Sequence, residues 1–188
     1  MPDSHFSSGL RLHLGCGTNI QPGWVNIDRE ARAPGVVTDV DPAALPYPDG
    51  TVSEILAEHV FEHFSFSEEQ EVWLELARVL HPGGVLTIEV PDFEWVCRTF
   101  LEAQDEWRAF YQIGHPDHYA GCGRALDQRW GILQTMFFGN QNGLGQFHRC
   151  AYTEGKLRAL AAQMGFAHIR IQRLFNKGGQ VLRASLTR

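Results

Sequence analysis

The stretch that decides the fold is Arg11-Leu12-His13-Leu14-Gly15-Cys16-Gly17, together with Val25-Asn26-Ile27-Asp28 shortly after it. A short apolar run that ends in Gly-x-Gly, followed by an apolar run that ends in an acid, is typical of a nucleotide-binding α/β sheet. Gly15 and Gly17 have no Cβ, so they permit a sharp turn and a close approach to a ligand. The Asp28 carboxylate can accept hydrogen bonds from a ribose diol. These residues predict a nucleotide pocket but do not identify the nucleotide.

Length and composition indicate one globular domain, residues 1–188. The chain has 44% hydrophobic and 20% charged residues and a formal net charge of −6. A chain of this length buries roughly 70% of its unfolded surface in one core. The acidic balance argues against double-stranded nucleic acid as a partner. No apolar run of membrane-spanning length and no leader-like start are present, so we expect a cytoplasmic protein without membrane insertion.

Alternating patterns predict strands at residues 10–14, 24–27, 36–39, 54–57 and 85–90, with a helix between the last two. Ser67 and Gln70 have the spacing of a capping box at the start of this helix. Its buried stripe is predicted as Val72, Leu76, Val79 and Leu80, and residues 82–84 are predicted to end it. Strand, helix and strand in this order predict parallel neighbours.

The first connection is short. About ten residues separate Leu14 from Trp24, and they include Pro22 and Gly23. A parallel crossover normally needs a dozen or more residues. We therefore expect a first helix of one or two turns at most.

The second half of the chain divides into three predicted parts. A helix is predicted from Phe93 to about Arg108, and the glycine-rich residues 111–148 are predicted to form an irregular insertion or lid. Thr153 is predicted to cap a helix that runs through Met164. Strands at 168–175 and 180–186 are predicted to pair as an antiparallel hairpin.

Taken together, the motifs resemble the class I S-adenosylmethionine-dependent methyltransferases, type-11-like group. Five segments match in the family's order: residues 12–17, 26–28, 45–52, 58–63 and 78–86. The resemblance implies a single-domain, Rossmann-like α/β fold with a mostly parallel seven-stranded sheet, helices on both faces and an antiparallel C-terminal hairpin. It also implies a cofactor-binding half at 10–110, an acceptor-side insertion at 111–148, and a C-terminal helix and hairpin at 149–188.

The activity implied by the resemblance is methyl transfer by in-line displacement. The cofactor is S-adenosylmethionine, and the expected acceptor is a small molecule, a lipid precursor or a glycan intermediate. The oligomeric state is not predicted. NAD is the rival cofactor, but its fingerprint requires a third glycine where Ile20 stands and a later acid than Asp28.

The resemblance also assigns cofactor contacts by position. Near the methionyl group it places three residues of the turn, Gly15, Cys16 through its backbone, and Gly17. At the ribose it places Asp28, and beside the sulfonium and amino-acid end it places Glu58 and His59.

The adenine contact has two candidates. Asp39 with the backbone of Val40 is one, because the following N–H must donate to the base. Asp41 is the other, since its distance from Leu45 fits the family better, but Pro42 after it has no N–H. Both remain open.

An acceptor hydroxyl or amine would benefit from a general base. The candidates are His59, His148, His118 and Asp92. The chain departs from the family at His13, where an acid is usual, and at residues 18–19, where the third glycine is missing. These departures keep open a second hypothesis, a non-catalytic methyltransferase-like module that binds or regulates a partner.

His59-Val60-Phe61-Glu62-His63 also has the pattern H-x-x-E-H of inverted zinc proteases. No credible third ligand is visible in the sequence, and the family resemblance already explains this segment. We therefore expect no metal. His115, His118 and His148 are interpreted as lining of the acceptor pocket.

Overall fold

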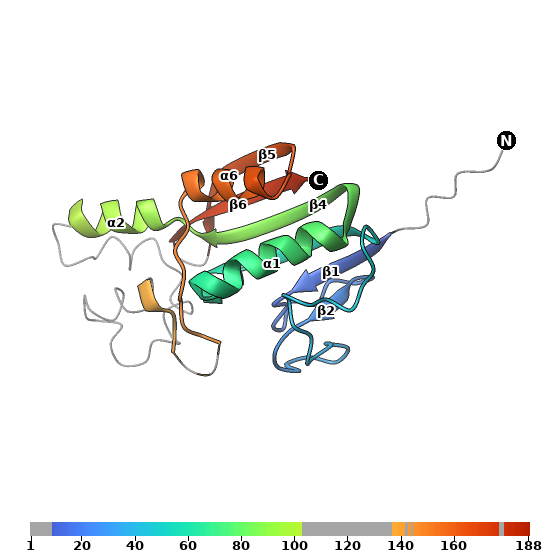
Figure 1. Cartoon of the computed structure of the whole chain (residues 1–188). Coiled ribbons are helices and arrows are strands. Elements are labelled where there is room, and N and C mark those ends of the chain that lie inside the picture. The colour runs from blue at the N-terminus through green and yellow to red at the C-terminus, as the bar shows by residue number, and fades with distance from the viewer. Residues whose placement is uncertain (1–8, 103–136, 142, 144, 177–178) are drawn as a thin grey trace.

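Six strands form one mixed sheet in the computed structural model of the chain, which describes residues 9–102, 137–141, 143, 145–176 and 179–188. Their order is β2-β1-β3-β4-β6-β5, and the first four run parallel (Figure 1). β6 is antiparallel to both β4 and β5. The α/β class and the C-terminal hairpin are thus confirmed. The strands are β1 (Leu10–Leu14), β2 (Val25–Ile27), β3 (Val52–Glu58), β4 (Leu80–Pro91), β5 (His168–Asn176) and β6 (Gly179–Thr187).

The strand predicted at 36–39 is reduced to a single bridge between Ile27 and Val37. The Val37 amide donates to Asn26 O at 2.8 Å, and the Asp28 amide donates to Val37 O at 3.1 Å. Asp39 then adopts φ 60°, which ends the extended run. The described residues therefore hold six strands, and the expected seventh is not confirmed.

No helix forms between β1 and β2, so the prediction of a short first helix is wrong. The buried Asn26 side chain fixes this connection instead. It accepts from His13 Nδ1 and the Gln21 amide, at 3.3 and 2.9 Å, and donates to the carbonyls of Gln21 and Trp24, both at 3.1 Å. His13, which stands in place of the family's acid, is 1% exposed, and burial lowers its pKa. The hydrogen bonds of the Asn26 side chain thus hold the connection between β1 and β2 without a helix.

The N-cap of helix α1 (Phe66–Val79) lies two residues before the predicted one. Ser65 is the N-cap: its Oγ accepts from the Glu68 amide at 3.3 Å, and its own amide donates to Glu68 Oε2 at 2.6 Å. Both halves of a capping box are present there. The assignment to Ser67 and Gln70 is therefore wrong.

The end of α1 also lies earlier than predicted. Leu80 already pairs with Val52 as the first residue of β4, and Val85 pairs with Glu54. The intervening residues 81–84 bulge from the ladder, because four residues of β4 stand opposite one residue of β3. The segment at 82–84 is an irregularity within β4 and not the end of the helix.

Helices α1 and α6 (Glu154–Gln163) cover one face of the sheet (Figure 1). Thr153 caps α6 as predicted, with the Lys156 amide 3.2 Å from its Oγ1. The largest fully buried side chains of this layer are those of Trp73, Tyr152, Phe61, Leu12, Ile55, Leu76, Leu80, Leu86 and Ile88. On the other face, Thr87 of β4 and Ser185 of β6 are paired and line a shallow surface depression. Helices on both faces are not confirmed by these elements.

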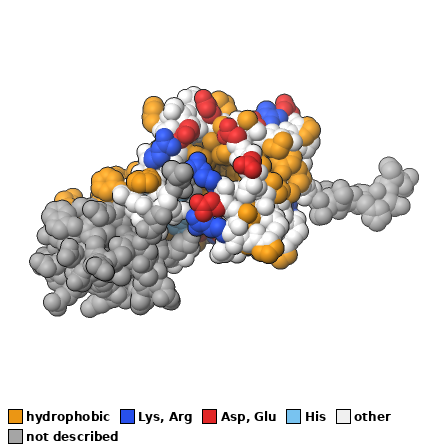
Figure 2. Space-filling model, turned by 90° about the horizontal axis from the view of Figure 1, so that it is seen from below, with side chains coloured by type: hydrophobic (Ala, Val, Ile, Leu, Met, Phe, Trp, Pro, Cys, Tyr) orange, Lys and Arg blue, Asp and Glu red, His pale blue; other side chains and the backbone are white. Residues whose placement is uncertain are grey.

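Helix α2 (Phe93–Glu102) follows β4, and the remainder of the predicted helix to Arg108 lies outside the described residues. Most of the glycine-rich stretch lies outside them as well. No helix among the described residues is long and apolar enough to cross a membrane. On the face shown in Figure 2, acidic and basic side chains lie beside one another.

Candidate active site

A cleft of about 1660 Å³ opens at the carboxyl ends of β1, β2 and β3. From β1 the chain passes to β2 on one side, and β3 lies on the other. This is a topological switch point, where open α/β sheets bind their ligands. Residues 145–149, far along the chain, line the same cleft. Two distant segments therefore share one site. We call the lining from residues 15–41 the glycine wall and the lining from residues 59–63 and 145–149 the opposite wall.

The glycine turn after β1 has no room for side chains at its first position. Gly15 has φ 63°, and a Cβ there would lie 2.3 Å from Val60 Cγ2. Gly17 has φ 53°, but a Cβ there would meet nothing within 4 Å. The turn thus needs glycine at 15 for space and at both positions for conformation. Sequence reasoning identified both.

Cys16, between the glycines, faces the protein more than the cleft. Its amide extends the β1–β2 ladder by donating to Ile27 O at 3.1 Å, and its side chain is 3% exposed. Burial raises the pKa of the Cys16 thiol, so this thiol stays protonated. Cys16 therefore positions the turn, and its amide is already used.

Asp28 connects the ends of β1 and β2. One carboxylate oxygen accepts from the Gly17 amide at 2.8 Å, and the other accepts from the Glu30 amide at 3.0 Å. A carboxylate has about four lone-pair sites. Each oxygen therefore keeps capacity for one further donor, which suits the two hydroxyls of a ribose.

The two acids at the adenine end differ in what they already bind. Asp41 caps its own turn, because its Oδ1 accepts from the Ala43 amide at 2.9 Å. Asp39 is exposed in the left-handed region, and its Oδ2 accepts from Thr38 Oγ1 at 3.3 Å. The Val40 amide donates to no backbone carbonyl of the described residues. Asp39, Val40 and Asp41 all line the cleft.

His59, just after β3, is held at both ring nitrogens by carboxylates. Nδ1 lies 3.1 Å from Glu62 Oε1, and Nε2 lies 3.3 Å from Glu89 Oε1. Both ring nitrogens of His59 therefore already lie beside a buried carboxylate. Glu58, which precedes it, accepts from Arg183 Nη1 at 2.9 Å.

Glu89, Asn176 and Arg183 support this edge of the cleft and were missed by sequence reasoning. Glu89 is 1% exposed and accepts from Asn176 Nδ2 at 2.5 Å and from Arg183 Nη1 at 2.9 Å. Burial alone would raise the pKa of Glu89, but hydrogen bonds from His59, Asn176 and Arg183 outweigh it and hold the pKa at about 2. The sequence signal that could have identified Glu89 and Arg183 was a charged residue inside each of two otherwise apolar strands.

The opposite wall is built by the short 3-10 helix η1 (Phe61–His63) and by residues 147–149. His148 lines the cleft there, and its ring lies 5.0 Å from that of His63 between centroids. The other predicted base in the glycine-rich stretch, His118, lies outside the described residues.

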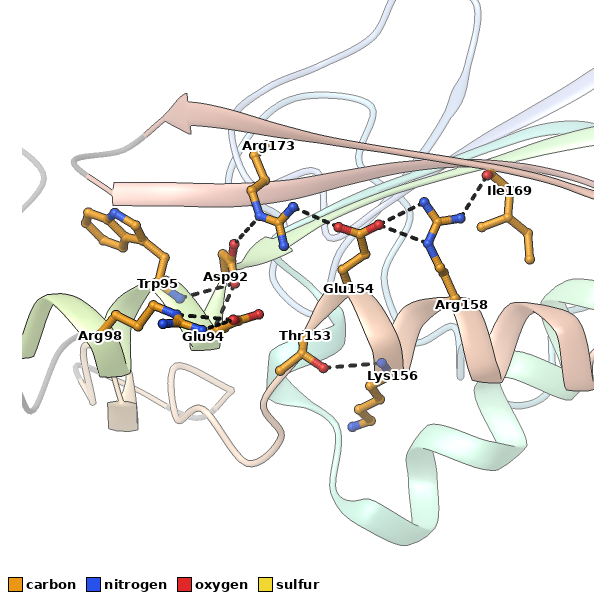
Figure 3. Close-up of polar contacts among 10 residues, drawn as sticks. All are labelled: Asp92, Glu94, Trp95, Arg98, Thr153, Glu154, Lys156, Arg158, Ile169 and Arg173. Carbon is orange, nitrogen blue, oxygen red and sulfur yellow. Dashed lines mark hydrogen bonds and ion pairs between the residues drawn. The ribbon is translucent and has the colours of Figure 1, made fainter.

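Asp92 has a different place from the one expected of a base. It is 1% exposed at the start of α2, where its Oδ1 accepts from the Glu94 and Trp95 amides at 3.2 and 3.3 Å (Figure 3). Its Oδ2 lies 3.1 Å from Arg173 Nε, and Arg173 also pairs with Glu154 of α6. Asp92 is not among the residues that line the cleft. It joins α2, β5 and α6.

Comparison with known proteins finds a family match over the first part of the chain. Residues 12–88 match the family described as "Methyltransferase domain". This segment contains the glycine turn, Asp28, both adenine candidates and His59. No curated protein sequence matches the chain.

Solved structures share the fold at low sequence identity. A SAM-dependent methyltransferase from Archaeoglobus fulgidus aligns with a TM-score of 0.59 and 13% identity, over 97% of this chain and 88% of that one. A possible histamine N-methyltransferase from Thermotoga maritima aligns with a TM-score of 0.56 and 16% identity, over 100% and 83%.

A third structure was solved with ligands. The 1,6-didemethyltoxoflavin-N1-methyltransferase of Burkholderia thailandensis, with its substrate and S-adenosylhomocysteine bound, aligns with a TM-score of 0.60 and 13% identity, over 96% of this chain and 71% of that one. Residues 12–88 therefore match a methyltransferase domain, the chain has the fold of the class I S-adenosylmethionine-dependent methyltransferases, and S-adenosylmethionine is the cofactor that these matches indicate.

Proposed function

We propose that the chain transfers a methyl group from S-adenosylmethionine to a small molecule, a lipid precursor or a glycan intermediate by in-line displacement. The observation that carries this proposal is the bond between the Gly17 amide and the Asp28 carboxylate at the switch point. It joins a side-chain-free turn to an acceptor with spare lone pairs. These are the two features that a methionyl-ribose unit needs.

The residues of the wall formed by residues 15–41 fit the cofactor. Gly15 and Gly17 would face its methionyl part, and Asp28 would accept from its ribose hydroxyls. For the adenine we favour Asp39 with the Val40 amide, because Asp41 already caps its own turn. Cys16 would position the turn but would not donate a hydrogen bond to the cofactor, because its amide already donates to Ile27 O.

The reaction needs alignment more than a protein nucleophile. The sulfonium of the bound cofactor supplies an electrophilic methyl carbon, so the protein has to orient the acceptor and exclude water. Around His59 the carboxylates of Glu58, Glu62 and Glu89 outnumber the Arg183 guanidinium. Such a surplus of negative charge favours a positively charged group nearby.

Among the candidate bases, His148 is the one that we place beside the acceptor. His59 is held by carboxylates at both nitrogens, and Asp92 caps α2. His148 lines the wall opposite the glycine turn. The acceptor would thus lie between Gly15 on one side and His148 on the other.

Isothermal titration calorimetry with S-adenosylmethionine and S-adenosylhomocysteine tests the proposal. We expect one site per chain for each compound, and release of S-adenosylhomocysteine when the protein is incubated with an acceptor of the proposed classes. Absence of binding for both compounds contradicts the proposal. Binding without turnover of any acceptor across these classes would favour the binding or regulatory module.

A further inference from the structure

Glu62, His63 and His148 gather at the wall opposite the glycine turn. One potential ligand atom of each lies within 4.8 Å of the other two. The amides of Arg149 and Cys150 both donate to the Glu62 carbonyl, at 2.7 and 3.0 Å. These backbone bonds fix the segment of His148 against η1, so the cluster does not depend on mobile side chains alone.

The Glu62 carboxylate is only half satisfied. The residue is 2% exposed, and its Oε1 lies 3.1 Å from His59 Nδ1. Its Oε2 is buried and has no hydrogen-bond partner among the described residues. A buried carboxylate oxygen without a partner is costly and calls for an explanation. A bound cation would supply the missing partner.

His63 is oriented as a ligand. Its Nδ1 lies 3.0 Å from the carbonyl oxygen of Phe147, which can only accept, so Nδ1 carries the hydrogen. The neutral ring then has its lone pair on Nε2. A backbone carbonyl that receives the second N–H is the usual support of a metal-binding histidine.

We propose that Glu62, His63 and His148 bind one divalent transition-metal cation, with Zn²⁺ as the reference ion. Two imidazole nitrogens and one carboxylate oxygen form a donor set common to Zn²⁺ and Fe²⁺ sites. Neighbouring ligand atoms around tetrahedral Zn²⁺ lie about 3.3 Å apart, so small side-chain rotations close the cluster. The sequence predicted no metal because a third ligand was missing from H-x-x-E-H; His148 supplies it, and His59 supports Glu62 instead.

The position suggests a role on the acceptor side. All three residues line the cleft, so the cation would be open to an acceptor oxygen. It would lower the pKa of an acceptor hydroxyl and hold it in place, a role that rests on the proposed methyl transfer. His148 would then act as a ligand rather than as a base.

The test is a Zn²⁺ titration by calorimetry on the untagged full chain after chelator treatment, with Co²⁺ absorption as a second readout. We expect one Zn²⁺ per chain and a rise in Kd of at least about 100-fold for His63→Ala, His148→Ala and the isosteric Glu62→Gln. His81, near the start of β4, is not one of the proposed ligands. His81→Ala is therefore the matched control and should change the Kd for Zn²⁺ by less than about threefold. Circular dichroism checks that each variant folds.

Titration of the same variants with S-adenosylhomocysteine separates this proposal from the proposed function. We expect His63→Ala and His148→Ala to keep that affinity within about threefold, because they lie on the other wall. If Zn²⁺ does not bind, or binds equally to the wild type and all three folded variants, the metal site is wrong while the cofactor site stands. If Zn²⁺ binds as expected and S-adenosylhomocysteine does not, the metal site stands and the proposed methyl transfer fails.

Discussion

The two walls of the cleft are built in different ways. The glycine wall consists of backbone turns within residues 15–41, and Asp28, the side chain that we propose for the ribose, is bound by amides two and eleven residues away. The opposite wall consists of histidine and glutamate side chains, and it forms only because residues 147–150 bind η1. The glycine wall is formed by residues that are close in sequence, whereas the opposite wall is formed by residues that are far apart in sequence. This difference indicates where substitutions should act on cofactor affinity and where they should act on the acceptor.

The largest effect on the glycine wall is expected for Asp28→Ala. The change removes the proposed ribose acceptor and the bond that holds the Gly17 amide. We expect the affinity for S-adenosylhomocysteine to fall at least about 100-fold, as for loss of two hydrogen bonds to a charged group. Calorimetry measures it, with the exposed Glu54→Ala on β3 as control. Unchanged affinity in Asp28→Ala would remove the glycine wall from the cofactor site.

Comparison of Gly15→Ala with Gly17→Ala separates the cost of steric overlap from the cost of backbone strain. In Gly15→Ala, the new Cβ would overlap Val60 Cγ2, and the alanine would also have to adopt φ 63°. We expect a loss of about 3 kcal/mol in the free energy of unfolding, from overpacking and strain together. Gly17→Ala, with the same strain but open space, should lose about 1 to 2 kcal/mol.

The double variant Gly15→Ala/Val60→Ala completes this comparison. It removes Val60 Cγ2 and should recover part of the loss relative to the sum of the single variants. Urea unfolding measures the wild type, Gly15→Ala, Gly17→Ala, Val60→Ala and the double variant. If Gly15→Ala and Gly17→Ala lose the same free energy, contact with the opposite wall does not constrain the turn.

Glu89→Gln tests the buried charge beside His59 and Arg183. The pKa of Glu89 is held at about 2, below its usual value of 4.5. Its stabilisation is therefore complete above about pH 4.5 and is lost as the pH falls toward 2. At pH 7 we expect Glu89→Gln to be less stable by about 2 to 3 kcal/mol, and this gap should shrink on acidification. Unfolding at pH 7, 5 and 3 measures it; a gap that widens with acid would contradict the assignment.

The smallest effect distinguishes the two capping boxes. Ser65→Ala removes the Oγ that accepts from the Glu68 amide and should cost about 1 kcal/mol of unfolding free energy. Ser67→Ala should change it by less than about 0.5 kcal/mol. Thermal unfolding compares them, and S-adenosylhomocysteine binding should stay the same in both. The reverse order would restore the cap at Ser67.

The sequence predicted what depends on near neighbours. Gly15, Gly17 and Asp28 were found because their roles follow from backbone conformation and from position after a strand. The capping box was misplaced by two residues, because serine stands at both 65 and 67 and only the start of the helix distinguishes them. The short first connection predicted a helix of one or two turns, whereas no helix forms there.

What the sequence could not predict depends on distant contacts. Glu89 and Arg183 are 94 positions apart, and only the pairing of β4 with β6 brings them together. His148 was named as a pocket residue, but its neighbours Glu62 and His63 follow from the backbone bonds that Arg149 and Cys150 donate to Glu62. Asp92 was placed at the site by its position after a strand, whereas its partner Arg173 comes from β5.

A crystal structure with S-adenosylhomocysteine tests the division of the cleft most directly. The account predicts both ribose hydroxyls within about 3 Å of the Asp28 carboxylate, the methionyl part against Gly15 and Gly17, and the sulfur facing His148. A ligand whose ribose lies away from Asp28, or whose methionyl part lies against η1 instead of the glycine turn, would contradict it.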